Sequence, residues 1–235
     1  MTAGIIAAGL GERLREAGIT VPKPLVEVAG TPLIDHILDT VAAAGIDEAA
    51  CIFNCAADAV EAHCRARRGG PRLEIVRRTT PSSMESLFVL APHLRDGPAL
   101  VLTVDAVFAP VVLRAFLVAA AEHADADVVL AVTDFVDDEK PLRLALAAGG
   151  RVAALGDDAA TSPFVTAGFY VFHPRVFEEI PAARAARFTA LRQYLCHLLR
   201  RGYRIYGAQV GKTVDVDRPE DIAAADAFVR SGFTS

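Results

Sequence analysis

The residues near the start of the chain that are best suited to chemistry are two glycines, an arginine and a lysine: Gly9, Gly11, Arg13 and Lys23. Glycine lets the backbone approach a ligand closely, arginine offers a planar fork of donors, and lysine is a compact cation. Pro22 and Pro24 flank Lys23 and restrict the backbone on both sides of it. Together these residues favour a site for a chain of phosphates, such as a triphosphate.

Two other phosphate-binding patterns fit the same stretch less well. A dinucleotide fingerprint needs a third glycine where Leu14 stands, and Gly18 and Pro22 interrupt the helix that should follow Gly11. The P-loop string G-x-x-x-x-G-K-[ST] does not occur in the sequence. A purely structural alternative is a tight glycine turn with two cations that face solvent.

Three motifs in this region resemble the N-terminal signature of the nucleoside-triphosphate transferase family: residues 9–13, 22–25 and 30–34, which read GLGER, PKPL and GTPLI. That family includes the sugar-1-phosphate and phosphocholine nucleotidylyltransferases. The resemblance implies transfer of a nucleotide from a triphosphate to a phosphorylated small molecule, with a divalent metal. It also implies that Ala8, Gly9 and Gly11 contact the nucleotide, and that Arg13 and Lys23 stabilise the triphosphate and the leaving pyrophosphate.

An acid follows the most strand-like segment of the chain. Residues 99–104 are apolar on both faces, as in a central parallel strand, and Asp105 comes directly after them. The implied reaction brings two phosphates together, and Mg²⁺, which prefers carboxylate, phosphate and water oxygens, would neutralise their charge. We therefore predict that Asp105 is a magnesium ligand. Its alternative role is to cap a helix that begins at Pro110.

The second metal ligand is expected in residues 211–222, GKTVDVDRPEDI, which resemble the C-terminal motif of the family. Asp217 is the first choice and Asp215 the second, with helix capping as the alternative role of Asp217. Asp215 and Asp217 also form the Asp-x-Asp pattern of metal-dependent glycosyltransferases, as do Asp125 and Asp127. The lysine loop near the start of the chain favours nucleotidyl transfer over that alternative.

The remaining predicted site residues concern the base and the acceptor. Ser83 lies in TTPSSMESLF, a region that helps to hold the base in the family, and capping of a helix is its alternative role. The sugar-nucleotide branch often has Glu-Lys-Pro before a strand like residues 165–172, and this chain has an acidic pair there, Asp157 and Asp158. Such a pair would repel a sugar phosphate and could attract a cationic head group.

Two residues could contact the acceptor. Lys212 could supply the missing cation for the acceptor phosphate, the alternative being an exposed loop lysine. Tyr170, or Phe169 beside it, could contact a cationic head group through its ring.

Strands and helices alternate along the first half of the chain. We predict strands at 3–8, 49–54, 73–76, 99–104 and 127–132, and helices at 31–44, 58–67 and 110–122. A further helix is expected after a capping box of Ser82 and Glu85, with its apolar face at Leu87, Leu90, Ala91 and Leu94. Thr31 is expected to cap the first of these helices. The second half is richer in strands, predicted at 142–147, 152–155, 165–172, 203–209 and 213–216, with helices at 174–180, 189–201 and 219–230.

This order predicts a three-layer α/β/α fold of Rossmann-like type, with a mixed and mostly parallel sheet. We expect one domain over residues 1–235, with a nucleotide-binding half at 1–133 and an acceptor-binding half at 134–235.

Composition narrows the class of protein. Of the 235 residues, 53% are hydrophobic and the net charge is −5, which argues against a nucleic-acid partner. The four cysteines have no zinc-binding spacing and are expected to be reduced thiols. With no secretory signal or membrane-spanning run in the sequence, we predict a cytoplasmic enzyme without a membrane partner. A molybdopterin-type nucleotidyltransferase and a non-catalytic nucleotide-binding regulatory module are the alternatives, and base, acceptor and oligomeric state stay open.

Overall fold

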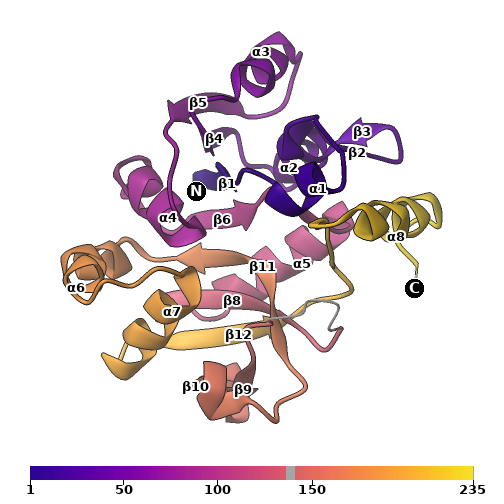
Figure 1. Ribbon diagram of the computed structural model, residues 1–235. Coiled ribbons are helices and arrows are strands. Elements are labelled where there is room, and N and C mark those ends of the chain that lie inside the picture. The colour runs from indigo at the N-terminus through magenta and orange to yellow at the C-terminus, as the bar shows by residue number, and fades with distance from the viewer. Residues whose placement is uncertain (136–140, 235) are drawn as a thin grey trace.

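A mixed seven-stranded sheet forms the centre of the molecule in the computed structural model, which describes residues 1–135 and 141–234 (Figure 1). Its strand order is β12-β8-β11-β6-β1-β4-β5. The strands are β1 (Ala3–Ala7), β4 (Glu48–Phe53), β5 (Arg72–Arg77), β6 (Ala99–Thr103), β8 (Val128–Thr133), β11 (Val165–Phe172) and β12 (Ile205–Gln209). Only β11 runs antiparallel to its neighbours, β6 and β8, among the described strands of this sheet.

Helices cover both faces of the sheet and give the three layers. One face is packed by α1 (Glu12–Glu16), α2 (Leu33–Ala43), α3 (Asp58–Ala66), α5 (Pro110–Ala121) and α8 (Pro219–Arg230). The other face is packed by α4 (Ser83–Leu90), α6 (Ile180–Ala185), α7 (Leu191–Arg200) and the hairpin of β9 (Leu144–Leu146) and β10 (Val152–Leu155). The predicted fold class is therefore confirmed. The division into two functional halves stays a prediction, and it includes residues outside the described range.

The order of short elements explains how distant parts of the chain meet. The 3-10 turn η1 (Lys23–Leu25) follows α1, and β2 (Glu27–Val28) and β3 (Thr31–Pro32) form a small hairpin. The remaining 3-10 turns are η2 (Ala91–His93), η3 (Ala148–Gly150), η4 (Gly156–Ala159) and η5 (Pro174–Glu179). Near the C-terminus, the short strand β13 (Val214–Asp215) pairs with β7 (Ala106–Val107), which follows β6 in the chain.

The predicted cap of α2 is wrong. Thr31 pairs with Val28 in the hairpin, and α2 begins at Leu33 after Pro32, which has a φ of −56°. Ala29 and Gly30 form the turn of the hairpin, with φ angles of 53° and 81°. The second strand of the hairpin is Thr31 and Pro32, which the sequence analysis assigned to the start of the helix.

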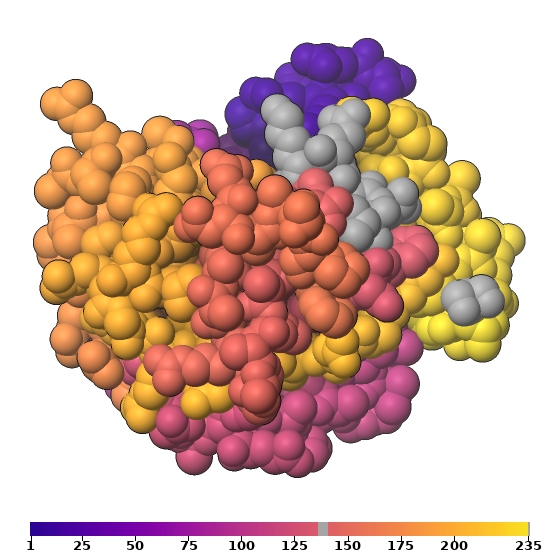
Figure 2. Space-filling model, turned by 90° about the horizontal axis from the view of Figure 1, so that it is seen from below, coloured from indigo at the N-terminus to yellow at the C-terminus, as the bar shows by residue number. Residues whose placement is uncertain are grey.

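The C-terminal helix α8 packs against the β2–β3 hairpin from the start of the chain. In Figure 2 the C-terminal segment, in yellow, lies beside the N-terminal segment, in indigo. Asp226 of α8 accepts a hydrogen bond of 2.6 Å from the backbone N–H of Ala29, which fixes α8 against the β2–β3 hairpin. No helix within the described ranges is long and apolar enough to cross a membrane, and the predicted cytoplasmic location stays a prediction.

Candidate active site

The loop after β1 brings Gly11 directly against Lys23. Gly11 has a φ of 60°, and a Cβ built on it would lie 3.0 Å from the Cβ of Lys23. A larger residue would therefore be strained by its backbone angle and would also press on the lysine stem. Pro22 and Pro24 flank the lysine in η1, and this fixed backbone directs its side chain inward.

Lys23 forms a bridge between two acids that are distant in sequence. Its Nζ lies 2.6 Å from Oδ2 of Asp105 and 2.5 Å from Oδ1 of Asp217, which are 82 and 194 residues away. The lysine side chain is only 8% exposed. Burial by itself lowers the pKa of Lys23, but Asp105 and then Asp217 outweigh it and hold that pKa above its ordinary value. The lysine is thus charged throughout the physiological range.

Asp105 keeps its negative charge in this setting. Burial by itself raises the pKa of Asp105, but the charge of Lys23 and its hydrogen bond lower that pKa below the ordinary value. The ion pair with Lys23 offsets the free-energy cost of burying a carboxylate just after the carboxyl end of β6.

The pairing of β13 with β7 carries Asp217 to the sheet edge. Asp215 pairs with Ala106, and the N–H of Val216 donates to the carbonyl of Asp105 at 3.0 Å. The carboxylate of Asp221 accepts from the N–H groups of Asp217 and Arg218, at 2.9 and 2.7 Å. Because Asp221 serves the start of α8, the side chain of Asp217 is not its cap and turns to Lys23 instead.

Arg13 also faces this group of charges. Its Nη1 lies 3.6 Å from Oδ2 of Asp217, and its side chain is half exposed. The structure therefore brings together four predicted site residues: Arg13, Lys23, Asp105 and Asp217.

A cavity of about 820 Å³, here called the larger cavity, extends from these charges past the carboxyl ends of β1 and β6 to the segment that follows β5. Its lining includes Gly9, Gly11, Arg13 and Lys23 near one end, and residues 79–83 with Ser86 near the other. Figure 1 shows α1 and α4 on opposite sides of β1, which separates the two ends. Ala8 is 2% exposed with its side chain in the core, so only its backbone could contact a ligand.

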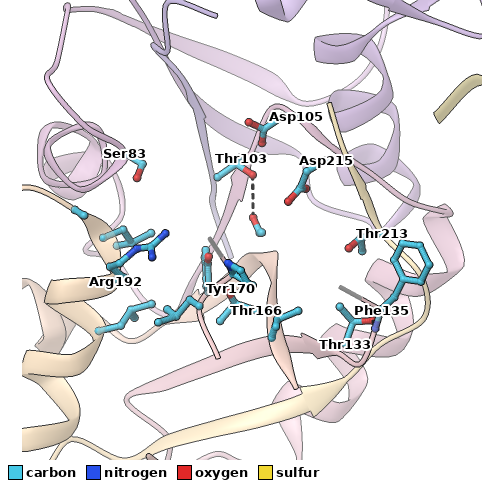
Figure 3. Close-up of a pocket in the computed structure, with 17 residues that line it drawn as sticks. Ser83, Thr103, Asp105, Thr133, Phe135, Thr166, Tyr170, Arg192, Thr213 and Asp215 are labelled. Carbon is cyan, nitrogen blue, oxygen red and sulfur yellow. Dashed lines mark hydrogen bonds between the residues drawn. The ribbon is translucent and has the colours of Figure 1, made fainter. Parts of the chain in front are cut away.

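A second cavity of about 280 Å³, here called the smaller cavity, lies on the other side of Asp105 (Figure 3). Its polar side chains are Ser83, Thr103, Asp105, Thr133, Thr166, Tyr170, Arg192, Thr213 and Asp215. In Figure 3, Ser83 and Arg192 lie on one side of it, opposite Thr213 and Phe135. Burial raises the pKa of Tyr170 to about 12, so its hydroxyl stays protonated and can donate or accept.

Three residues line both cavities: Ser83, Thr103 and Asp105. A group bound in one cavity can therefore meet a group bound in the other at the end of β6. Thr103 donates a hydrogen bond of 3.4 Å to the carbonyl of Gly168, marked in Figure 3, so β11 is fixed to this junction. Gly168 has a φ of 81°, and a Cβ on it would lie 3.1 Å from the hydroxyl oxygen of Thr103.

Some of the predicted site residues lie away from Lys23 or make contacts other than those expected. Asp215 lines the smaller cavity rather than the group around Lys23. The ammonium of Lys212 lies 4.5 Å and 5.2 Å from the ring centres of Phe135 and Phe228, and Lys212 lines neither cavity. Ser83 does line the larger cavity, and the capping hydrogen bond of α4 comes from Ser82, whose Oγ accepts from the N–H of Glu85.

Sequence reasoning missed several residues of the smaller cavity. Arg192 stands on α7, Thr166 on β11 and Thr133 on β8, three elements that are distant from one another in the sequence. No local motif marks them, and only the order of strands in the sheet brings them together.

The carboxylates are chemically suited to Mg²⁺, which proteins often hold with one or two carboxylates together with substrate phosphates and water. The Asp105 and Asp217 oxygens contact the same nitrogen, so they are at most about 5 Å apart. Among residues 1–135 and 141–234, no group of three or more His, Cys, Asp or Glu side chains could hold a metal without further ligands. The donor set thus fits a metal that is shared with a phosphate ligand.

Comparison with known proteins agrees with this geometry. A family model described as "MobA-like NTP transferase domain" matches residues 3–205. The chain belongs to this family. The predicted membership of a nucleoside-triphosphate transferase family is confirmed.

Among curated relatives, N-acetylmuramate alpha-1-phosphate uridylyltransferase of Caulobacter vibrioides is 38% identical over 112 residues, which are 44% of this chain and 45% of that protein. CMP-5'-(3-aminopropyl)phosphonate synthase of Streptomyces rubellomurinus is 34% identical over 155 residues, 58% of this chain and 24% of that protein. These matches thus span less than half of each relative's length. An inositol-1-phosphate CTP transferase from T. maritima has the same fold, with a TM-score of 0.81, 17% identity, and coverage of 100% of this chain and 98% of that one.

Proposed function

We propose that the protein transfers a nucleoside monophosphate from a nucleoside triphosphate to a phosphorylated small molecule and releases pyrophosphate. The observation that carries this proposal is the position of Lys23 and Asp105. Lys23 stands at the inner wall of the larger cavity, and its partner Asp105 also lines the smaller one. Such a site holds two anionic ligands end to end with a buried cation at their meeting point.

In the proposed reaction, an oxygen of the acceptor phosphate or phosphonate attacks the α-phosphorus of the triphosphate. The bond from that phosphorus to the bridging oxygen breaks, and the electron pair leaves with pyrophosphate. Lys23 and Arg13 neutralise the leaving pyrophosphate, and Gly9 and Gly11 offer backbone N–H groups to its oxygens. Catalysis here consists of positioning and charge stabilisation, without a covalent intermediate on the protein.

Asp105 and Asp217 would hold Mg²⁺, with Asp215 as second choice for the second ligand. When bound, the metal would neutralise charge on the phosphate oxygens. The supporting observation is that both carboxylates already face one cationic group, Lys23, across the junction.

The smaller cavity is proposed to hold the acceptor. Arg192 can bind a phosphate or phosphonate through two parallel hydrogen bonds, and the surrounding hydroxyls suit a polar small molecule. The two relatives named above are described as acting on a sugar 1-phosphate and as making a nucleotide-linked aminoalkylphosphonate, so both acceptor classes are candidates. Tyr170 is part of this proposed site, whereas the position of Lys212 supports a packing role over the rings of Phe135 and Phe228.

Pyrophosphate release across a panel of triphosphates, each combined with sugar 1-phosphates, phosphocholine and aminoalkylphosphonates, tests the proposal. Release that requires both a triphosphate and one class of acceptor supports it. Tight triphosphate binding without release for any acceptor, including a molybdopterin cofactor, would favour a non-catalytic regulatory module. Release with the molybdopterin acceptor alone would favour the molybdopterin-type alternative.

A further inference from the structure

The two carboxylates proposed to hold Mg²⁺ already have a cation of the protein between them. Nζ of Lys23 lies 2.6 Å from Oδ2 of Asp105 and 2.5 Å from Oδ1 of Asp217. The other oxygen of Asp217, Oδ2, lies 3.6 Å from Nη1 of Arg13. One oxygen of each acid thus faces an ammonium, and a further oxygen faces a guanidinium. A metal that uses these oxygens has to compete with side-chain cations.

The ammonium of Lys23 and a metal on the same oxygens would be close neighbours. Mg²⁺ binds carboxylate oxygens at about 2.0–2.1 Å. A Mg²⁺ on Oδ2 of Asp105 would therefore lie no more than about 4.7 Å from Nζ of Lys23 while the hydrogen bond between those two residues persists. Only 8% of the lysine side chain is exposed, so little water screens the repulsion between the two positive charges. We expect the binding of one cation to weaken the binding of the other.

The side chain of Lys23 also has a second place for its charge. Pro22 and Pro24 restrict its backbone, whose carbonyl accepts from the N–H of Val26 at 3.1 Å. Its Cγ and Cδ lie 3.8 Å from the position that a Cβ on Gly11 would take, so the stem runs beside the glycine loop. Both Lys23 and Gly11 line the larger cavity. Rotation about the outer bonds of the side chain can thus turn the ammonium from the acids to an anion in that cavity.

We propose that Lys23 and Mg²⁺ exclude each other at Asp105 and Asp217, so that the metal enters only with a triphosphate that takes over the ammonium. This rests on the proposed function, which assigns the metal to these two acids. Without a triphosphate, Lys23 keeps both carboxylates paired and the metal affinity low. With a triphosphate, phosphate oxygens accept the ammonium, and the carboxylates become available to the metal. The lysine thereby couples metal binding to nucleotide binding.

The test is Mn²⁺ binding to the full chain without nucleotide, measured by electron paramagnetic resonance of the free ion. Lys23→Met removes the charge and keeps an unbranched stem, so the dissociation constant for one Mn²⁺ per chain should fall at least about tenfold. Arg15→Met is the matched control, because it removes one charge from an exposed residue that lines neither cavity. It should leave the constant within about twofold. An unchanged constant in Lys23→Met, or an equal gain in both variants, would overturn the inference.

A double variant locates the gained site. Asp217→Asn added to Lys23→Met should remove the gain, because it takes away one of the two carboxylates. A gain that persists would place the metal elsewhere and contradict the inference. If Lys23→Met does not fold, Lys23→Gln, whose neutral amide can still donate to a carboxylate, should show the same gain.

Thermal melting tests the coupling in the wild-type protein. Mn²⁺ alone should raise the melting temperature of Lys23→Met, but that of the wild type only together with one of CTP, ATP, UTP or GTP. Equal stabilisation of both proteins by Mn²⁺ alone would overturn the inference.

Metal binding and turnover separate this inference from the proposed function. If the wild type releases pyrophosphate in a Mg²⁺-dependent manner while Lys23→Met gains no Mn²⁺ affinity, the function stands and the exclusion fails. If Lys23→Met gains an affinity that Asp217→Asn removes while no acceptor supports release, the exclusion stands and the proposed function fails.

Discussion

The two cavities that meet at Asp105 are built in different ways. The larger cavity is lined mostly by two stretches, residues 9–13 with Lys23, and residues 79–83 with Ser86. The smaller cavity is assembled from more elements, with residues from β8, β11, α7 and the segment around β13. The first can bind through backbone groups and a turn of fixed shape, whereas the second depends on how separate elements are packed.

This difference suggests which property each cavity controls. A continuous loop keeps its geometry as long as its own glycines and prolines stay in place. A site assembled from four elements changes when any of them shifts or exchanges one side chain. We therefore expect the larger cavity to set the chemistry and the smaller cavity to set the acceptor, and the following experiments test that division.

The largest effect is expected from Lys23→Ala, which removes the buried cation at the junction. Turnover should fall by about a thousandfold or more, because charge stabilisation of this kind accounts for a large part of such catalysis. Steady-state pyrophosphate release measures it, with thermal melting as a check on folding. Arg15→Ala is the matched control, since Arg15 is an exposed cation on the same segment that lines neither cavity. Comparable losses in both variants would contradict the role of Lys23.

The next effect separates two acids of the same motif. Asp217→Asn should lower turnover by about a hundredfold and raise the Mg²⁺ concentration needed for half-maximal rate, because Asp217 faces Asp105 across Lys23. Asp215→Asn should act mainly on KM for the acceptor, since Asp215 lines the smaller cavity. The opposite pattern would assign the metal to Asp215.

Arg192→Ala tests the acceptor side alone. Removing a guanidinium that is proposed to bind the acceptor phosphate should raise KM for the acceptor by about 10- to 100-fold and leave KM for the triphosphate within about twofold. Arg192→Lys should recover only part of the loss, because an ammonium cannot form two parallel hydrogen bonds. An equal rise in both KM values would show that the two cavities do not act separately.

Gly168→Ala should act through the backbone rather than through a lost contact. The residue has a φ of 81°, and the added methyl would lie 3.2 Å from the Cβ of Ala106. We expect a loss of about 1–2 kcal/mol in the free energy of unfolding, measured in urea, because a left-handed backbone is strained for alanine. Gly18→Ala is a matched control with φ of 88° and no atom within 4 Å, so a larger loss at Gly168 isolates the crowding at the junction.

The smallest effect concerns the support of the smaller cavity. Glu179 accepts a hydrogen bond from His197 of α7 at 2.6 Å, and this contact, with Arg201 and Tyr203, lowers the pKa of Glu179 below its ordinary value. A carboxylate with a depressed pKa adds stability above its ordinary pKa of about 4.3, and this contribution is lost as the pH falls below it. Glu179→Gln should therefore reduce the free energy of unfolding by up to about 1 kcal/mol at pH 7 and have little effect at pH 3. Urea unfolding at both pH values checks this, and an equal loss at both would contradict it.

Much of the fold could be predicted from the sequence because its signals are local. Alternating apolar runs and helical patterns gave the bounds of α8 and β11 without error, residues 219–230 and 165–172. The positions of Lys23 and Asp105 followed from a loop motif and from an acid at the end of a buried strand. Both are properties of one continuous segment.

The smaller cavity could not be predicted for a physical reason. Arg192 is one of several arginines on or near α7, and nothing in its neighbours marks it as the one that lines the cavity. Lys212 and Thr213 are also hard to tell apart from the sequence. They are adjacent, yet Thr213 lines the smaller cavity and Lys212 lies over two phenylalanine rings, because neighbouring side chains of an extended segment point to opposite sides.

The antiparallel direction of β11 has a consequence for how such a protein can change. Since β11 runs opposite to β6, its first residues, rather than its last, lie at the edge of the sheet where Thr103 and Asp105 stand. The connection that enters β11, residues 156–164, therefore reaches the side of the smaller cavity, the proposed acceptor site, without passing through any strand that supports Lys23 or the glycine loop. Under the proposed function, exchange or lengthening of this connection would offer a route to new acceptors that leaves the proposed triphosphate site unchanged, in evolution as well as in the laboratory.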